Sequence, residues 1–268
     1  ASGAAGSQAS RTMRSWVQSA PAHRALSRAL EARIYEGLAL QRPILDVGCG
    51  DGYFAQAALP QPIDVGIDPS PAALAECAQS GIYAELRQAS GDALPFPDAT
   101  FATVVSNCVL EHIPPIDRTI QEIGRVLRPG GTFVGTMVTD QLAGLLGIPR
   151  TLRTLGLPGI AEAYATWFNR KAQHYNMLPL SEWSAKLAQA GLHVNRSQYY
   201  LGPAAMLVFD FLHYYALPAA VIHMFFHRWL LWQSPRNVVL IARLLQGVYN
   251  EGIPTCGSCV FVIAKKEE

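Results

Sequence analysis

The feature that most constrains the fold is a short apolar run that ends at a cluster of glycines and continues as a helix. The run Ile44-Leu45-Asp46-Val47 stops at Gly48-Cys49-Gly50-Asp51-Gly52, and a helical pattern follows through residues 53–59. Strand, glycine turn and helix in this order are typical of nucleotide-binding α/β folds. Glycines at 48 and 50 let the backbone approach a ligand closely because they carry no side chain.

The alternation of strand and helix continues downstream. Strand patterns at 63–67, in the 84–88 region, and at 102–106 and 132–138 alternate with helical patterns at 72–79 and 119–127. A helix at 181–190, a strand at 193–200 and a short strand at 259–264 follow. This rhythm predicts an α/β fold with a Rossmann-like, doubly wound and mostly parallel seven-stranded sheet.

The length of the chain fits one elaborated domain better than two, because 268 residues bury one substantial core. We expect residues 1–40 to form a disordered start and a helical cap. Residues 41–268 would then form the α/β domain, with helical insertions at about 139–179 and 203–253. In the cap, a helix broken at Pro21 is expected to bury Trp16, Val17, Leu26, Leu30 and Ile34.

The charge of the chain argues against nucleic acid as a partner. The formal net charge is only +1, whereas binding to a phosphate backbone usually needs a strongly basic surface. Charged residues make up 15 % of the chain and hydrophobic ones 50 %, so part of the surface is expected to be unusually apolar.

Acidic residues narrow the kind of ligand that the glycine turn would accept. Asp46 ends its strand, Asp51 lies in the turn, and Asp68 ends the next strand, where it can accept hydrogen bonds from ribose hydroxyls. A dinucleotide would place its pyrophosphate against the two carboxylates of the turn, and Tyr53 replaces the third glycine of the dinucleotide pattern. A cationic ligand fits this turn better.

The run from Ile44 to Gly52 resembles the first signature of the class I S-adenosylmethionine-dependent methyltransferases. Four later segments resemble further signatures in the order of that family: Gly66-Ile67-Asp68-Pro69-Ser70, Gly91-Asp92-Ala93-Leu94-Pro95-Phe96, Val109-Leu110-Glu111-His112-Ile113 and Arg128-Pro129-Gly130-Gly131. The resemblance is closest to the methyltransferase type 11-like branch, which acts on small molecules. It implies S-adenosylmethionine as the cofactor and methyl transfer to O, N or C of a small apolar or amphipathic acceptor.

The resemblance also implies which residues bind the cofactor. The methionine part would be lined by Asp46, Gly48 and Gly50, with Cys49 as a small wall residue, and the ammonium would meet the carbonyl of Asn107. Asp68, followed by Pro69, would bind the ribose, and Asp92 with Ala93 the adenine edge. Each acid has an alternative role as the cap of a turn or a helix.

Transfer of a methyl group from a sulfonium needs little chemical help, because the leaving group is neutral and the protein mainly holds the acceptor in line and dry. A base would serve a hydroxyl or a neutral amine. His112, after the fourth strand, is the first candidate, and its alternative is a packed polar residue before Pro114. His174 and Tyr175, at the end of the first insertion, could position the acceptor.

The segment 203–232 is the most apolar part of the chain, and residues 211–227 lack Asp, Glu, Lys and Arg. It is too short and too interrupted, by Pro218 among others, for a membrane span. Three interpretations remain: a lid over an apolar acceptor, a peripheral membrane contact, or a homodimer surface. No metal is expected, although His213, His223 and His227 lie in this region.

The cysteines and the first residues favour a cytoplasmic protein, with peripheral membrane association as an addition to that hypothesis. Five scattered cysteines suit a reducing compartment, and residues 1–10 lack the pattern of a secretory signal. Cys256 and Cys259 have the spacing of half a zinc site or of a redox pair, but no second pair lies nearby. The alternative functions are an NAD-type oxidoreductase and a non-catalytic module that binds the cofactor or a membrane.

Overall fold

One seven-stranded sheet forms the centre of the protein, with the strand order β3-β2-β1-β4-β5-β7-β6. The computed structural model describes residues 13, 15–17, 21–59, 62–114, 116–213 and 235–268. Strands β1 to β5 are parallel, and β7 pairs antiparallel with both β5 and β6. The Rossmann-like, mostly parallel sheet predicted from the sequence is confirmed. The strands are β1 (Ile44–Val47), β2 (Ile63–Asp68), β3 (Tyr83–Gln88), β4 (Phe101–Asn107), β5 (Leu127–Val138), β6 (Leu192–Tyr200) and β7 (Cys259–Lys266).

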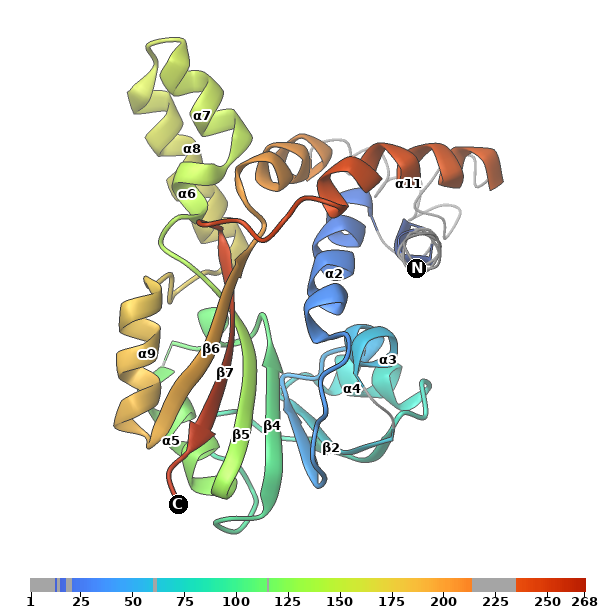
Figure 1. The fold of residues 1–268 in the computed structure, drawn as a ribbon, viewed down its shortest axis with the longest axis vertical. Helices are drawn as coiled ribbons and strands as arrows, with labels where there is room; N and C mark the ends of the chain where they lie inside the picture. The colour runs from blue at the N-terminus through green and yellow to red at the C-terminus, as the bar shows by residue number, and fades with distance from the viewer. Residues whose placement is uncertain (1–12, 14, 18–20, 60–61, 115, 214–234) are drawn as a thin grey trace.

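Helices cover both faces of the sheet and extend beyond one of its ends (Figure 1). Helices α5 and α9 lie on one side and α3 and α4 on the other, while α2, α11 and the group α6, α7 and α8 lie beyond the carboxyl ends of the parallel strands. Their bounds are α2 (Ala22–Tyr35), α3 (Tyr53–Ala58), α4 (Pro71–Ala78), the 3-10 helix η1 (Leu110–His112), α5 (Ile116–Val126), α6 (Leu142–Leu145), α7 (Gly147–Thr154), α8 (Pro158–Ala172), α9 (Leu180–Gln189) and α11 (Pro235–Tyr249).

Two apolar clusters fill the space between the sheet and its helices. Adjacent strand residues point to opposite faces, so Val104 packs in the cluster under α5 and α9 and Val105 in the cluster with α2 and α3. In β1, Ile44 belongs to the cluster with α2, and Leu45 and Val47 belong to the other. The same alternation turns Asp46 toward the α2 side of the sheet.

Helix α2 begins directly after Pro21, and its buried side chains agree with the sequence prediction. Leu26, Leu30 and Ile34 are at most 7 % exposed, and Trp16 and Val17, which precede α2, are also buried. Because a helix has 3.6 residues per turn, other positions of α2 form a separate face. This second face carries Arg24, Arg28 and Glu31 toward the carboxyl ends of β1 and β4.

The first insertion is helical and comprises α6, α7 and α8, which the sequence pattern alone did not resolve. The signature segment Arg128-Pro129-Gly130-Gly131 lies inside β5, where the register with β4 shifts between Phe101 and Thr103 and Gly130 has a φ of +69°. Residues 203–213 are helical. The predictions for residues 1–10, for residues 214–232, and for His223 and His227 concern parts of the chain outside the described residues.

Among the helices in the described ranges, none has the length and apolarity needed to cross a membrane.

Trp183 links α9 to the end of β5, and we expect it to matter for stability. Its ring is fully buried, and Nε1 donates a hydrogen bond to the carbonyl oxygen of Val138 over 3.1 Å. Trp183→Phe leaves that carbonyl without this partner and opens a small void, so the free energy of unfolding should fall by about 1–3 kcal/mol. Trp167→Phe, at a ring that is 42 % exposed, should change it by about 0.5 kcal/mol or less. Urea denaturation of both variants measures these changes in the free energy of unfolding. Equal losses in the two variants would contradict the stabilising role assigned to Trp183.

Candidate active site

The turn after β1 requires glycine for two physical reasons. Gly48, Gly50 and Gly52 have φ values of +79°, +56° and +75°, a region that residues with a side chain rarely adopt. At Gly48 space adds a second reason, because a Cβ atom there would lie 2.5 Å from a methyl group of Val109. The backbone N–H groups of Gly48 and Cys49 both donate to the carbonyl of Ile67 at 2.9 Å, which joins the turn to β2.

Asp68, at the end of β2, fixes the shape of this turn. One carboxylate oxygen accepts from the backbone N–H of Gly50 at 3.0 Å, and the other accepts from the backbone N–H of Ser70 at 2.9 Å. Ser70 in turn caps α4, since its hydroxyl accepts from the backbone N–H of Ala73. Asp68 therefore connects the glycine turn with the start of α4.

Asp46 is a buried acid under the turn. Its side chain is 5 % exposed and accepts a hydrogen bond from the hydroxyl of Tyr83 at 2.6 Å. Burial raises the pKa of Asp46 to about 6, the hydrogen bond from Tyr83 lowers it, and the nearby charge of Asp68 raises it. The ionised form of Asp46 is thus destabilised until a cation or further hydrogen-bond donors approach it.

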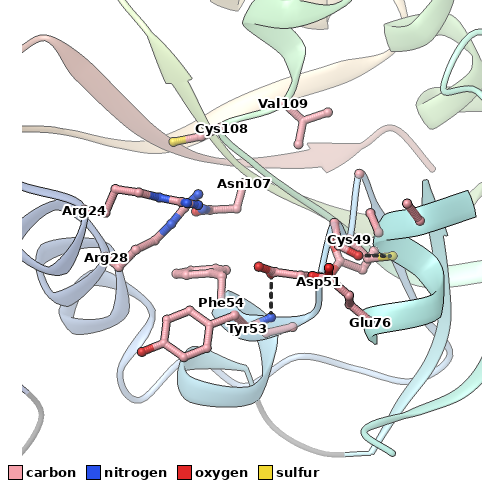
Figure 2. Close-up of a pocket in the computed structure, with 16 residues that line it drawn as sticks. Arg24, Arg28, Cys49, Asp51, Tyr53, Phe54, Glu76, Asn107, Cys108 and Val109 are labelled. Atoms are coloured by element: carbon pink, nitrogen blue, oxygen red, sulfur yellow. Dashed lines mark hydrogen bonds between the residues drawn. The ribbon is translucent and has the colours of Figure 1, made fainter. Parts of the chain in front are cut away.

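A first cavity of about 400 Å³ opens above this turn (Figure 2). Acidic side chains line it from the sheet side and from α4, namely Asp46, Asp51 and Glu76. On the opposite side, Arg24 and Arg28 extend from α2 toward Asn107 (Figure 2). The cavity therefore has a cationic end and an acidic end, which suits a ligand that carries charges of both signs.

The structure brings together part of the predicted cofactor site. Asp46, Gly48, Cys49, Gly50 and Asn107 line the first cavity. Asp68 stands behind it and is joined to it through the N–H of Gly50, whereas Pro69, Asp92 and Ala93 do not belong to its lining. The side chain of Asn107 is engaged elsewhere: Nδ2 donates to Glu31 and Oδ1 accepts from Thr136.

Several lining residues were not found from the sequence. The most informative are Arg24 and Arg28, which come from the helical cap, and Glu76, which comes from α4. Arg24 and Arg28 are four residues apart in a segment with a helical pattern, so they share one face of a helix whose other face is apolar. This spacing is a signal that could have located them. Glu76 gave no comparable signal.

A second cavity of about 320 Å³ adjoins the first and shares Arg24, Arg28 and Cys108 with it. Its apolar wall comes from the end of β5, from α6 and α8, and from the helical residues 203–213. The polar part of its lining comes from α2, η1 and the end of the first insertion. The large apolar side chains of this lining are Val138, Leu142, Phe168, Leu201, Met206 and Phe209. Besides the arginines and cysteines, its titratable side chains are His23, Glu31, Glu111, His112, His174 and His213.

The predicted catalytic histidines meet in this second cavity. The rings of His112 and His174 are 5.2 Å apart, and Nδ1 of His112 lies 3.1 Å from the carbonyl oxygen of Gln173. A carbonyl only accepts, so this contact places a proton on Nδ1 and leaves Nε2 of neutral His112 as an acceptor. Burial, with a smaller contribution from His112, lowers the pKa of His174 to about 4. The Tyr175 side chain is 59 % exposed and lines neither cavity.

Residues 45–135 match the family described as a methyltransferase domain. This part of the chain is a methyltransferase domain, in agreement with the sequence signatures. The matched range contains the glycine turn, Asp68, Asn107 and η1, and the chain segments that supply α2 and the wall of the second cavity lie outside it.

Relatives and solved structures agree with this assignment. The chain is 33 % identical over 170 residues to a ubiquinone biosynthesis O-methyltransferase of Chelativorans sp., a match that covers 60 % of this chain and 61 % of that one. The matches to such curated relatives span between 31 % and 62 % of the relative's length. In fold, it is similar to a possible histamine N-methyltransferase of Thermotoga maritima, with a TM-score of 0.55 and 15 % identity over 92 % of this chain and 91 % of the other. It is also similar to phosphoethanolamine N-methyltransferase 2 of Haemonchus contortus in complex with S-adenosyl-L-methionine. The TM-score is 0.57, and the identity is 16 % over 90 % of this chain and 52 % of the other.

The raised pKa of Asp46 predicts a pH dependence of stability with a definite sign. Between its unfolded value near 3.8 and about 6, folded Asp46 holds a proton that the unfolded chain has lost, so its contribution to stability falls as the pH rises through this range. Full ionisation should cost on the order of 3 kcal/mol. Denaturation at pH 4 and pH 7 should show Asp46→Asn gaining stability relative to wild type at the higher pH, whereas Asp51→Asn, in the exposed turn, should not. Identical pH profiles for all three proteins would contradict the assignment.

Proposed function

We propose that this protein transfers a methyl group from S-adenosylmethionine to a small acceptor. The observation that carries the proposal is the pair of adjoining cavities, one bipolar at the glycine turn and one largely apolar, with Arg24, Arg28 and Cys108 as a common wall. Two ligands bound in these cavities would meet at that wall. Such a meeting point is what a displacement reaction between a donor and an acceptor needs.

The residues of the first cavity fit this cofactor. Its carboxylate would find a cation in Arg24 or Arg28, and its cationic groups would face Asp46, whose ionised form lacks solvation. The two backbone N–H groups use only part of the acceptor capacity of the Asp68 carboxylate, so Asp68 can still accept from ribose hydroxyls. The adenine contacts of Asp92 and Ala93 stay predictions. When bound, the cofactor supplies a methyl group on a sulfonium, which leaves as a neutral thioether.

The second cavity would hold the acceptor, and its lining supports an apolar or amphipathic molecule. Phe168, Phe209 and Met206 offer an apolar surface, while His112 presents Nε2 as a hydrogen-bond acceptor. His174 is uncharged at neutral pH because of its burial, so we assign it a positioning role and not that of the base. A catalytic role for Tyr175 stays a prediction without support from the position of its side chain.

Binding of the cofactor is the first quantity to measure. Isothermal titration calorimetry with S-adenosylmethionine and S-adenosylhomocysteine should give saturable binding to the wild type, and Asp68→Ala should weaken it at least tenfold, by about 1.4 kcal/mol or more. Asp117→Ala on α5, which removes an exposed partner of Lys186, is the matched control and should bind like wild type.

Two other outcomes would change the assignment. Binding of NADH in place of both sulfur ligands would favour an NAD-type oxidoreductase, against which the carboxylates of Asp46 and Asp51 argue, because they would repel a pyrophosphate. Binding of the cofactor without any methylated product across a broad panel of small molecules would favour a non-catalytic module.

We propose that the helical residues 203–213 act as a cover of the acceptor cavity. Met206, Phe209 and His213 line that cavity, at the three- and four-residue spacing of one helix face. Leu207 and Phe211 are 49 % and 75 % exposed, and such outward apolar side chains leave a membrane contact or a homodimer surface as alternatives.

The cover and the membrane contact predict different results in liposome flotation. With vesicles of phosphatidylcholine and phosphatidylglycerol, we expect the wild type to stay in the protein fraction, because exposed apolar area at two side chains is too small for stable anchoring. Flotation of the wild type that is lost in Phe211→Ser would contradict this prediction and assign the surface to a membrane. Gel filtration of the wild type and of Phe211→Ser tests whether this surface forms a homodimer.

A further inference from the structure

Glu111 is a buried acid that the proposed function does not yet use. It lies in η1, directly after the residues that line the first cavity, is 1 % exposed, and contributes to the lining of the second cavity. Its Oε2 atom has no hydrogen-bond partner among the described residues. A buried polar oxygen without a partner is costly, so a group that supplies the missing hydrogen bond on binding gains the corresponding free energy.

The position of Glu111 is fixed by the end of the first insertion. Its backbone carbonyl accepts from the N–H groups of Tyr175 at 2.8 Å and Asn176 at 3.1 Å. The side-chain amide of Asn176 donates to the carbonyls of Leu110 and Ile113, on either side of Glu111. The backbone of Glu111 is therefore held in place before any ligand arrives, which lowers the entropic cost of binding.

Two arginines and one acid line the second cavity from α2, and the acid is already paired. Arg28 pairs with Glu31 at 2.6 Å, whereas Arg24 forms no ion pair within the described part of the chain. Burial, together with the charge of Glu31, raises the pKa of Glu111 to about 8, so its carboxyl group is mostly uncharged at pH 7. Burial also lowers the pKa of His23 and of His174 to about 4. A cationic acceptor would thus find Glu31 already paired with Arg28 and Glu111 mostly uncharged, so the second cavity offers it little free negative charge.

We propose that the acceptor is an uncharged hydroxyl compound with a compact apolar body, and that its hydroxyl group hydrogen-bonds to Glu111, which makes Glu111 a specificity-determining residue. This inference rests on the proposed function and names its substrate class. The apolar body would lie against Phe168, Phe209 and Leu142, in a cavity of about 320 Å³ that is at the small end of ligand pockets.

The reaction at that hydroxyl balances with the groups at hand. The hydroxyl oxygen forms a bond to the methyl carbon, the carbon–sulfur bond of the donor breaks, and its electron pair stays on sulfur. In the fraction of molecules in which Glu111 is ionised, the hydroxyl proton passes to its carboxylate, and it passes on to water once the product has left the cavity. A carboxylate whose proton affinity is increased by burial accepts this proton more readily than an exposed carboxylate does.

The inference separates this protein from two others of the same fold. The similar structures from Thermotoga maritima and Haemonchus contortus are named as N-methyltransferases of histamine and phosphoethanolamine, both of which carry amines. A shared fold does not transfer the acceptor. The balance of charge in the second cavity favours a hydroxyl over an ammonium in this chain.

Three probes of nearly equal size and shape test the inference: benzyl alcohol, benzylamine, which is protonated at pH 7, and ethylbenzene. Each is titrated calorimetrically into the protein saturated with S-adenosylhomocysteine. We expect benzyl alcohol to bind about tenfold more tightly than ethylbenzene, which corresponds to one buried hydrogen bond, and benzylamine to bind more weakly than either.

Variants of Glu111 then assign the preference to one side chain. Glu111→Leu should remove the roughly tenfold advantage of benzyl alcohol over ethylbenzene, and Glu111→Gln, which keeps hydrogen-bonding capacity, should largely retain it. Met206→Leu, in the apolar wall, is the control and should change the affinities of the three probes in parallel.

If Glu111→Leu does not fold, infrared difference spectra of the wild type decide instead. The band of a protonated carboxyl group should shift when benzyl alcohol binds, and this shift should be missing in Glu111→Gln.

The two levels of the proposal fail in different ways. Loss of S-adenosylhomocysteine binding in the wild type contradicts the proposed function. When S-adenosylhomocysteine binds normally, three results overturn only the inference about the acceptor. These are no binding of benzyl alcohol, binding of benzylamine as tight as that of benzyl alcohol, and a preference for the alcohol that persists in Glu111→Leu.

Discussion

The pair of hydrogen bonds that the Asp68 carboxylate accepts is the constraint on which the site depends. They join the backbone of the glycine turn to the start of α4, so one side chain sets the relative position of two elements that line the first cavity. The glycines leave room for a ligand beside the backbone, and Asp68 fixes the conformation of the turn. With three residues at positive φ, the turn has little intrinsic preference for its conformation, and an external clamp compensates for this.

Helix α2 connects the first cavity with the second, and it does so with one face of one helix. Its apolar face holds it in the core through Leu26, Leu30 and Ile34, and its polar face carries Arg24, Arg28 and Glu31. Glu31 receives hydrogen bonds from Arg28 and from Asn107 at the end of β4. A segment outside the matched methyltransferase range thus completes the site, which agrees with the rule that the fold provides the frame and added segments provide specificity.

The sequence predicted the frame well and the acceptor site poorly. The order of strands and helices, the glycine turn and the side chains of Asp46 and Asn107 follow local patterns or signature positions that can be read along the chain. Glu111 lies in a signature segment too, but its significance depends on burial and on an oxygen without a partner, and neither property has a sequence pattern. The charge balance around Arg24 likewise depends on contacts among α2, η1 and the end of the first insertion, which are far apart in sequence. Periodicity reports which face of an element is apolar, and it does not report which distant elements meet at its polar face.

The common wall formed by Arg24, Arg28 and Cys108 has a thermodynamic consequence. A molecule in either cavity restricts the same three side chains, so it changes the free energy with which the neighbouring cavity accepts its own molecule. This coupling is reciprocal: by whatever factor the donor alters the affinity for the acceptor, the acceptor alters the affinity for the donor. If the two cavities hold donor and acceptor as proposed, the two ligands bind as a coupled pair, and the affinity measured for one has meaning only when the state of the other is given.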